Sequence, residues 1–417
     1  MRPRPTAPAD SPSLLRRMNS AHVLEVIRER GPISRAQLAR ETGLSKPTVN
    51  EVVERLLDAT YVEEAAPADG LRPRRPGPRG RLLRFRADLG HVVGVDIGAD
   101  TALALVADLS GRILARERRA VSGQARAGQD PLLREVRATA RAALRAAGLG
   151  ADGLRAVGVG TPGVVDPASG RITLAPQLAG WEGLALGPRL QRTFGCPVVV
   201  DNETHVSLLA ETWRGAAQDV RDAVYVQVGV GIGGAVLVNG ELYRGATGAA
   251  GEIGYLAGDG DGAPEHGAGP FEWAAGARAY ARLGARAAAR PRAGALLREL
   301  AGGDPAAVTA QTVFAAAALG DAAAQEVVTE LTRRLARGVA GFVTALNPEL
   351  VIVGGGVANA GSALLEPLEA GVRALVPVPP RIELSRLGDE SVALGAVRLA
   401  ADVADASLFP LAADAAS

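Results

Sequence analysis

The chain has 417 residues, 47% hydrophobic and 22% charged, so it is long enough to bury more than one core, and two or three domains are expected. Its formal net charge of +1 conceals an asymmetry, because residues 1–90 hold 17 Lys and Arg against 11 Asp and Glu while the remainder holds 29 against 34; only the N-terminal part is basic enough to suggest a polyanionic partner. The single cysteine, Cys196, excludes an intramolecular disulfide framework, and without a long apolar run or signal-peptide pattern we expect a soluble cytoplasmic protein with no membrane partner.

The N-terminal part predicts a helical DNA-binding unit over residues 13–88, after a Pro-rich tail over residues 1–12 that is expected to be disordered. Ser34 is a natural N-cap for a second helix, Gly43 supplies a turn, and Ser45 caps a third helix. Three helices with a Gly-containing turn before the last one predict a helix-turn-helix.

The outward face of the third helix carries short polar and charged side chains that can reach base edges in the major groove. The alternative is an ordinary bundle helix that meets no DNA. The residues expected to contact DNA here are Ser45, Lys46, Thr48, Asn50, Glu51 and Arg55.

An arginine-rich stretch over residues 71–81 follows, and residues 82–86 then alternate weakly like a strand. This composition of Arg, Pro and Gly is typical of the wing of a winged helix, whose guanidinium groups contact phosphates or a narrow minor groove. A solvated linker is the alternative for this stretch taken alone. The expected DNA contacts of the wing are Arg72, Arg74, Arg75, Arg79 and Arg81.

Residues 92–108 and 223–238 form a weak internal repeat, since each predicts a strand, a Gly-rich turn and a second strand. Glycines in such turns allow backbone amides to approach a phosphate closely. Two hairpins of this kind are what an ATP cleft of the actin and sugar-kinase type requires, one in each lobe. We therefore expect a two-lobed α/β body over residues 89–404 and a loosely held tail over residues 405–417.

Beyond the two hairpins, the chain resembles the transcriptional regulators of the ROK family, named for repressors, open reading frames and kinases. The resemblance implies a winged helix-turn-helix followed by an actin/hexokinase-like body. The segments that carry it are Val157-Gly-Val-Gly-Thr-Pro-Gly-Val-Val-Asp166, Gly180-Trp-Glu-Gly183, Val200-Asp-Asn-Glu-Thr-His205, Gly248-Ala-Ala-Gly-Glu-Ile-Gly254 and Leu346-Asn-Pro-Glu-Leu-Val-Ile-Val-Gly-Gly-Gly356.

Several residues differ from those that the kinases of the family carry at positions used in phosphoryl transfer. Glu203 stands where the kinases have the Asp that acts as general base, and a displacement of about an ångström can cost about a hundredfold in rate. Asp100 and Val230 stand where the kinases carry Thr. The resemblance therefore implies that there is no catalytic residue and no enzyme activity, and that the phosphate loops are vestigial. These loops comprise Asp96, Gly98, Asp100, Gly229, Gly231 and Gly233.

The positions that bind the sugar in this family are better preserved in this chain. Their carboxylate and amide groups are suitable ligands for a polyol. Tyr255 replaces the family's His, and residues 259–267 lack the family's cysteines, so neither a structural zinc ion nor any cofactor is expected. The alternative is that the matched acids only stabilise a cleft loop. The residues that the resemblance assigns to sugar binding are Gln177, Asn202, Glu203, His205, Glu252, Tyr255 and Glu272.

The sequence thus predicts a DNA-binding transcriptional regulator, a sugar-responsive repressor of carbohydrate genes. It is expected to act as a homodimer or dimer of dimers on a pseudo-palindromic stretch of double-stranded DNA. Two alternatives stay open. One is an ATP-dependent sugar kinase with an added DNA-binding domain, and the other is a DNA-binding dimer whose vestigial body answers to a protein partner.

Overall fold

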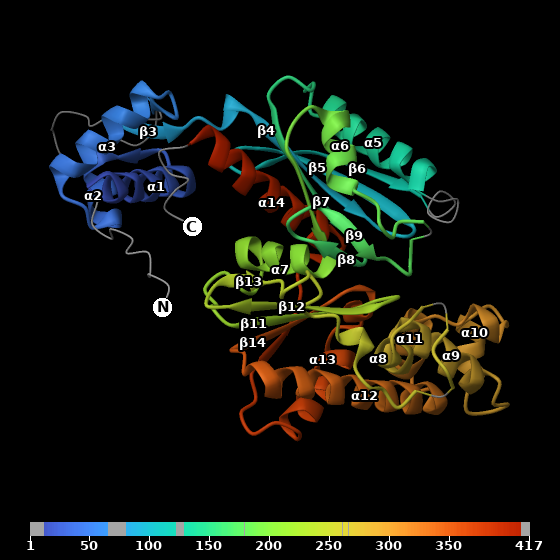
Figure 1. The fold of residues 1–417 in the computed structure, drawn as a ribbon. Helices are drawn as coiled ribbons and strands as arrows, with labels where there is room; N and C mark the ends of the chain where they lie inside the picture. Colours follow the sequence, from blue (N-terminus) through green and yellow to red (C-terminus); the bar gives the residue numbers. More distant parts are fainter. Residues whose placement is uncertain are drawn as a thin grey trace, which may run out of the picture.

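The computed structural model describes residues 12–65, 81–121, 129–178, 180–260, 262–265 and 267–409. Figure 1 shows a small N-terminal unit beside the upper of two lobes, with the lower lobe beneath. The expected DNA contacts Arg72, Arg74, Arg75 and Arg79 lie outside the described residues.

The N-terminal unit is a winged helix, as predicted. Ser34 caps the second helix in a reciprocal capping box with Gln37, and the Ser45 hydroxyl accepts from the Thr48 amide at 3.3 Å to start the third. Three short strands form a sheet in the order β1-β3-β2. The elements are α1 (Pro12–Arg30), β1 (Ile33–Ser34), α2 (Arg35–Thr42), α3 (Lys46–Asp58), β2 (Val62–Ala65) and β3 (Leu82–Phe85).

The upper lobe is built on a five-stranded sheet in the order β10-β7-β4-β5-β6, with a separate two-stranded ribbon, β8-β9. Strands β4, β5 and β6 are antiparallel neighbours, whereas β7 and β10 run parallel to β4 and β7. Its elements are β4 (His91–Ile97), β5 (Thr101–Asp108), β6 (Ile113–Ala120), α5 (Gln129–Ala146), β7 (Leu154–Thr161), β8 (Val164–Asp166), β9 (Arg171–Leu174), α6 (Leu186–Phe194) and β10 (Val198–Asn202).

The lower lobe repeats this topology, because its sheet has the order β13-β12-β11-β14-β15 with the same pattern of antiparallel and parallel pairs. The internal repeat expected from the two Gly-rich hairpins is therefore confirmed. The strands are β11 (Ala223–Val228), β12 (Ile232–Val238), β13 (Glu241–Tyr243), β14 (Leu350–Gly354) and β15 (Arg381–Leu384). The helices are α8 (Pro270–Ala275), α9 (Ala277–Ala288), α10 (Ala295–Leu300), α11 (Ala310–Ala318), α12 (Ala322–Leu346) and α13 (Ser362–Arg373).

Two helices join the lobes: α7 (Glu203–Arg214) follows β10 of the upper lobe, and α14 (Ser391–Leu408) follows β15 of the lower one. They pack on one another, and α14 also packs on β4 and β7 of the upper sheet. In Figure 1, α14 runs from the region between the lobes to the winged helix.

The expected tail over residues 405–417 is corrected in its first part, because α14 continues to Leu408. Phe409 is only 1% exposed and lies between Tyr61 and Phe85, with ring centroids at 4.6 and 5.7 Å. The local sequence gives no sign of this burial, since the partners of Phe409 are more than 300 residues away in the chain. Residues 410–417 lie outside the described part of the chain.

Candidate functional site

The exposed face of α3 presents Lys46, Asn50 and Glu51 to solvent, as expected for a helix that enters a groove. Its opposite face is buried through Val49, Val52, Val53 and Leu56. Ser45 and Thr48 are engaged with each other, with their hydroxyl oxygens 2.8 Å apart, and Arg55 is half-buried. The geometry thus leaves Lys46, Asn50 and Glu51 as the freest of the expected contacts on α3.

The described base of the wing pairs its arginines with acids. Arg81 binds Glu64 across the β2-β3 pair, and Arg84 donates from Nε to Glu63 at 2.8 Å. These pairs are exposed, so each contributes little to stability and can exchange a carboxylate for a DNA phosphate at low cost.

A small cavity lies between the two lobes, and six of the seven residues expected to bind sugar line it. Its volume is about 50 Å³, and it shares Gln177, Glu203 and Gly231 with a larger cleft of about 960 Å³. Ligand pockets usually measure roughly 300–1,000 Å³, so the inner cavity alone is too small for a monosaccharide. The lining residues from the expected set are Gln177, Asn202, Glu203, Glu252, Tyr255 and Glu272.

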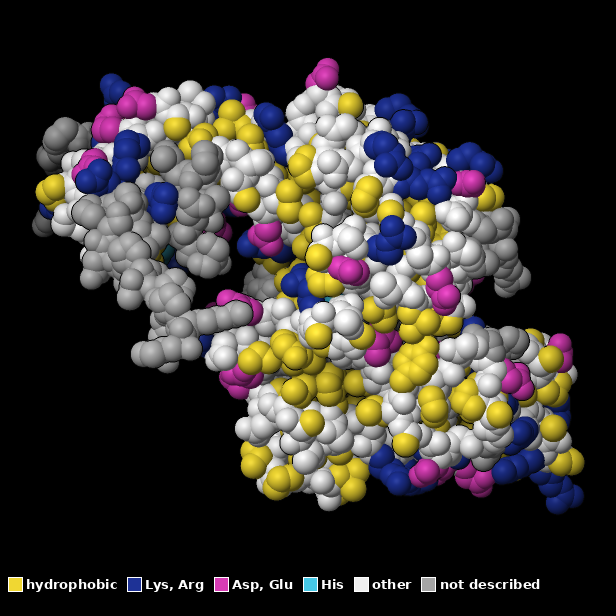
Figure 2. Space-filling model, viewed as in Figure 1, with side chains coloured by type: hydrophobic (Ala, Val, Ile, Leu, Met, Phe, Trp, Pro, Cys, Tyr) yellow, Lys and Arg dark blue, Asp and Glu magenta, His cyan; other side chains and the backbone are white. Residues whose placement is uncertain are grey.

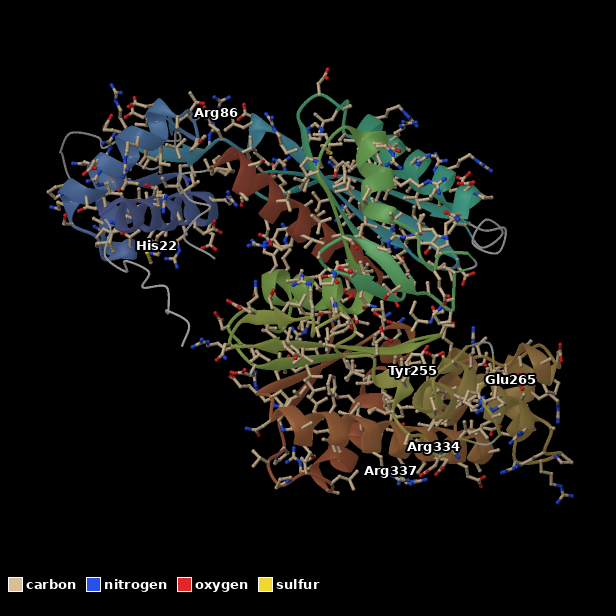
Figure 3. The ribbon with its side chains drawn as sticks, viewed as in Figure 1. His22, Arg86, Tyr255, Glu265, Arg334 and Arg337 are labelled. Atoms are coloured by element: carbon tan, nitrogen blue, oxygen red, sulfur yellow. The ribbon has the colours of Figure 1, made fainter. Side chains whose placement is uncertain are left out.

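The lobes meet closely at this cavity. A Cβ atom on Gly231 of the lower lobe would lie 2.7 Å from Gln177 Nε2 of the upper lobe and 3.2 Å from Glu272 Oε2. A larger residue here would force the ends of these two side chains to move. Tyr255 lies on the side of the lower lobe that faces the upper one, and its side chain is 47% exposed (Figure 3). A sugar that enters must therefore part the lobes or extend into the larger cleft.

Glu203, Glu252 and Glu272 line the cavity and have raised pKa values, and Asp96 lies near Glu203 without lining the cavity. Burial, with the neighbouring Asp96, Glu252 and Glu272, raises the pKa of Glu203 to about 8, and burial raises the pKa of Asp96 to about 7. Burial also raises the pKa values of Glu252 and Glu272. A protonated carboxyl group donates one hydrogen bond and accepts others, so this set can match both the donors and the acceptors of a polyol.

Asn202 and Glu203 are held by their own surroundings. The Asn202 side chain caps α7 by accepting from the Thr204 amide at 2.7 Å and donates to the Gly163 carbonyl at 2.7 Å. Gln227 Nε2 donates to Glu203 Oε1 at 2.9 Å. Much of the amide of Asn202 is thus occupied in fixing the helix, and Gln227, which sequence reasoning missed, orients the Glu203 carboxyl group.

His205 does not line the cavity, in contrast to the expectation of a sugar contact. It is 1% exposed, with Nδ1 3.0 Å from Asp201 Oδ1 and Nε2 2.9 Å from the Ala250 carbonyl oxygen. Arg244 Nε donates to the other Asp201 oxygen at 2.7 Å. Burial of Asp201 acts to raise its pKa, but the interactions with His205 and Arg244 outweigh burial and lower the pKa. His205 therefore ties the loop that carries Glu252 to α7.

The larger cleft contains the turns that the sequence assigns to vestigial phosphate loops. Gly98 and Asp100 line it from the upper lobe, and Val230 and Gly231 line it from the lower one. Gly229 donates to the Gly231 carbonyl at 2.9 Å, which closes the second turn. The cleft also contains Arg278 and Arg282 of α9, which sequence reasoning missed because no motif marks them.

The loop after Tyr255 is attached to α12 by an ion pair between Arg337 and Asp259 at 2.6 Å. Figure 3 labels Arg337 on this helix of the lower lobe. Across the described ranges, no group of three or more His, Cys, Asp and Glu side chains is placed to hold a metal ion.

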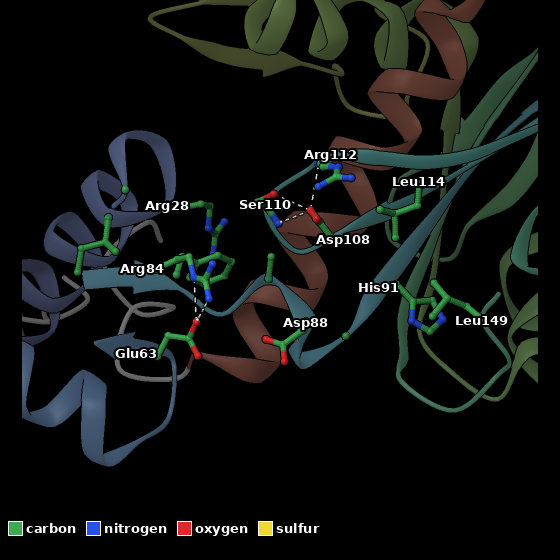
Figure 4. Close-up of a pocket in the computed structure, with 15 residues that line it drawn as sticks. Arg28, Glu63, Arg84, Asp88, His91, Asp108, Ser110, Arg112, Leu114 and Leu149 are labelled. Atoms are coloured by element: carbon green, nitrogen blue, oxygen red, sulfur yellow. Dashed lines mark hydrogen bonds and ion pairs between the residues drawn. The ribbon is translucent and has the colours of Figure 1, made fainter. Parts of the chain in front are cut away.

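The winged helix and the upper lobe enclose a groove of about 730 Å³ (Figure 4). Arg84 and Glu63 line it from the winged helix, while Asp108 of the upper lobe accepts from the amides of Ser110 and Arg112 at 2.9 and 3.0 Å.

A winged helix joined to two repeated α/β lobes with an acidic cavity between them defines a DNA-binding protein built on a sugar-kinase fold. The sequence matches the ROK family over residues 92–403 and the MarR family over residues 15–72. The chain belongs to the ROK family.

Similar proteins cover both halves of the molecule. The xylose repressor of Caldicellulosiruptor bescii is 28% identical over 406 residues, which span 95% of this chain and 98% of that protein. A ROK family glucokinase from Streptomyces griseus, solved with glucose and AMPPNP, is 29% identical with a TM-score of 0.66, over 75% of this chain and 99% of that one. A ROK family transcriptional regulator, a homologue of the Escherichia coli MLC protein, shares the fold over 96% of this chain and 100% of that one, with a TM-score of 0.75 and 23% identity.

None of the helices in the described part of the chain has the length and apolar composition that a membrane crossing requires.

Proposed function

We propose that this chain is a sugar-responsive DNA-binding repressor. The observation that carries the proposal is the junction, within one chain, of a DNA-reading unit and a cavity suited to a polyol, with α14 in contact with both the upper lobe and the winged helix. The similarity to a xylose repressor over 95% of the chain supports it, because that similarity includes the winged helix as well as the body.

The effector is a sugar or a sugar derivative that binds between the lobes. Glu252 and Glu272 of the lower lobe face Gln177 of the upper one across the cavity, so a polyol there would contact both lobes at once. Such a ligand favours one spacing of the lobes over another, which is the requirement for a conformational response.

The path from the cavity to the winged helix runs through α7 and α14. α7 begins at the cavity with Glu203, and its backbone at Val206 touches α14 so closely that a Cβ atom on Gly395 would lie 1.8 Å from the Val206 carbonyl oxygen. From Gly395, α14 extends by about 15 Å to Asp405. A displacement of α7 must therefore be followed by α14, because packed backbones cannot slide through one another.

The far end of α14 holds the winged helix. Asp405 binds Arg28 of α1, and Phe409 lies against Tyr61 and Phe85. Sugar binding thus changes the orientation of the winged helix through α14, and in a dimer it changes the spacing of two winged helices, so that affinity for the operator falls. The dimer, or dimer of dimers, and the pseudo-palindromic operator are parts of this proposal. The proposed function also requires a location in the cytoplasm, where the protein can reach chromosomal DNA.

Phosphoryl transfer is not part of the proposed function. Glu203 stands where the family's kinases carry the general-base Asp, and its longer side chain displaces the carboxyl group by about an ångström, which can cost about a hundredfold in rate. Asp100, at the mouth of the cleft, places a negative charge where a nucleotide would bring phosphates.

The second candidate is a sugar kinase with an added winged helix. The similarity of the body to a glucokinase solved with glucose and AMPPNP favours it. It predicts release of ADP with at least one hexose, and loss of that release in Glu203→Ala.

Calorimetric titration tests the proposed function. The purified chain is titrated with a panel of aldoses, ketoses and sugar phosphates, and ADP release is measured with the same panel. Binding of one sugar without ADP release supports a sensor. Turnover with that sugar supports the kinase, and binding of none would favour a body that answers to a protein partner.

A further inference from the structure

The upper lobe carries a stripe of arginines on α5 that the proposed function does not use. Arg134, Arg137, Arg141 and Arg145 are spaced by three, four and four residues, which places them on one helical face, while Leu133, Val136 and Ala140 fill the opposite face. Arg192 of the adjacent α6 extends the stripe. We call these five residues the arginine patch, and Figure 2 shows blue side chains gathered over α5 and α6.

The arginine patch lacks compensating acids. α5 and α6 together contain six arginines but only Asp130 and Glu135. Both acids are occupied, Asp130 by Arg189 and Glu135 by Arg119 at 3.7 Å. Among the residues that the structure describes, no member of the patch has an ion-pair partner.

The patch is unusual in its surroundings, because residues 91–417 contain 29 Lys and Arg against 34 Asp and Glu. Burial and the neighbouring Arg189 and Arg141 lower the pKa of Arg137, whose Nε is buried without a hydrogen-bond partner among the described residues. The positive charges of these arginines repel one another, and a bound polyanion would offset this repulsion.

Double-stranded DNA is the polyanion that fits best. From Arg134 to Arg145 the stripe spans about 16 Å, the length of about five base-pair steps, and so it can follow a line of phosphates. It lies on the lobe that is fixed to the winged helix by α14, and the two lie at opposite ends of this lobe in Figure 1. DNA that leaves the winged helix along this lobe would pass the patch.

We propose that the arginine patch binds the phosphate backbone of DNA that flanks the sequence read by the winged helix. This inference rests on the proposed function, since the winged helix must first hold the DNA. The contact is independent of base sequence and adds affinity through the release of counterions. It requires no new conformation of α5, because its exposed arginines already point to solvent.

The test compares the full chain with the variant Arg134→Ala/Arg141→Ala/Arg145→Ala on two probes, a random-sequence duplex of about 60 base pairs and a fragment from upstream of the gene. The matched control is Arg290→Ala/Arg292→Ala/Arg373→Ala, which removes three exposed arginines from the lower lobe. Arg134→Lys/Arg141→Lys/Arg145→Lys keeps the charge.

We expect the patch variant to bind the random duplex roughly tenfold more weakly in about 0.1 M salt, with a salt dependence shallower by about 0.9 per lost contact. The lower-lobe variant and the lysine variant should keep the parental slope. Equal slopes for all four proteins would overturn the proposal and leave an acidic protein as the partner class to examine. If the parental chain bound neither probe, the proposed DNA-binding function itself would have failed.

Discussion

Arg28 of the first helix and Asp405 of the last helix form a two-pronged ion pair, in which the Nη atoms of Arg28 donate to the Asp405 oxygens at 2.5 and 2.9 Å. The guanidinium group also lies over the Phe85 and Phe409 rings, at 4.7 and 5.6 Å from their centroids. This pair joins residues 377 positions apart. It ties the end of α14 to the winged helix, in addition to the chain connection through residues 86–90.

The substitution Asp405→Ala should uncouple DNA binding from sugar. Arg28 would keep only the longer ion pair with Glu25 of its own helix, at 3.7 Å, while Phe409 still holds the winged helix in place, so operator affinity without sugar should change little. The loss of affinity caused by sugar, roughly 5- to 150-fold for typical coupled sites, should shrink towards none. Gel-shift titrations with and without sugar measure both values.

The control is Asp402→Ala, one turn earlier, because Asp402 pairs with Arg398 within α14 at 2.8 Å. A full sugar response in Asp405→Ala would show that the signal takes another route.

Gly395→Ala should destabilise the body. The added methyl group would meet the Val206 carbonyl oxygen at 1.8 Å, and neither backbone has room to retreat in the packed junction of α7 and α14. We expect a loss of roughly 1 to 3 kcal/mol in the free energy of unfolding, measured with denaturant. Gly341→Ala on α12 is the control, since nothing lies within 4 Å of its Cβ position, and there we expect no loss. Equal effects at the two sites would refute the tight packing of α7 on α14.

Glu203→Gln should flatten the pH dependence of stability. Burial and the nearby acids raise the pKa of Glu203 from 4.5 to about 8, so the folded chain binds more protons than the unfolded chain between these values. The favourable contribution of the protonated acid is complete below pH 4.5 and is lost as the pH rises through 8. The variant lacks this loss, and it should therefore be more stable than the parent by roughly 1 to 3 kcal/mol at pH 8.5, with no gain near pH 4.5.

Thermal or denaturant unfolding across this pH range measures the effect. Glu182→Gln, at an exposed acid nearby, should leave the pH dependence unchanged. A parallel pair of curves for Glu203→Gln and the parent would mean that Glu203 is ionised in the folded protein.

Asn50→Ala should weaken the preference of the winged helix for particular bases in the DNA. Asn50 is exposed in the middle of the polar face of α3, and a bidentate amide contact to a base contributes roughly 1 to 3 kcal/mol of discrimination. Binding to a library of operator variants should show relaxed preference at one position of each half-site, while affinity for random DNA stays constant. Asp58→Ala, at the end of the same helix, should not alter the preference. Unchanged preference in Asn50→Ala would remove α3 from base readout.

Local signals in the sequence predicted the local parts of the structure. Ser34 and Ser45 mark the starts of α2 and α3 because a capping hydroxyl acts within three residues. The two Gly-rich hairpins predicted the repeated lobes because the same pattern of strand, Gly-rich turn and strand occurs in both.

Contacts between residues far apart in the sequence could not be predicted from local patterns. The family resemblance predicts a sugar contact for His205, yet the position of this side chain is fixed by Asp201 on one side and the distant Ala250 on the other. Phe409 falls in the predicted tail, and its burial could not be foreseen because its partners Tyr61 and Phe85 lie at the other end of the chain. Contacts of this kind depend on tertiary packing, which no spacing in the sequence reveals.

The central claim is that a sugar bound between the lobes releases the chain from DNA. Fluorescence anisotropy tests it most directly, with the full chain on labelled DNA from upstream of its own gene, a panel of monosaccharides and sugar phosphates, and the variants Glu252→Ala and Glu241→Ala. Glu252 lines the cavity, whereas Glu241 lies exposed on β13. We predict that one sugar lowers the DNA affinity of the parent and of Glu241→Ala, and that Glu252→Ala needs roughly 10- to 100-fold more of it. Specific DNA binding that no sugar alters, or release that Glu252→Ala leaves unchanged, would contradict the claim.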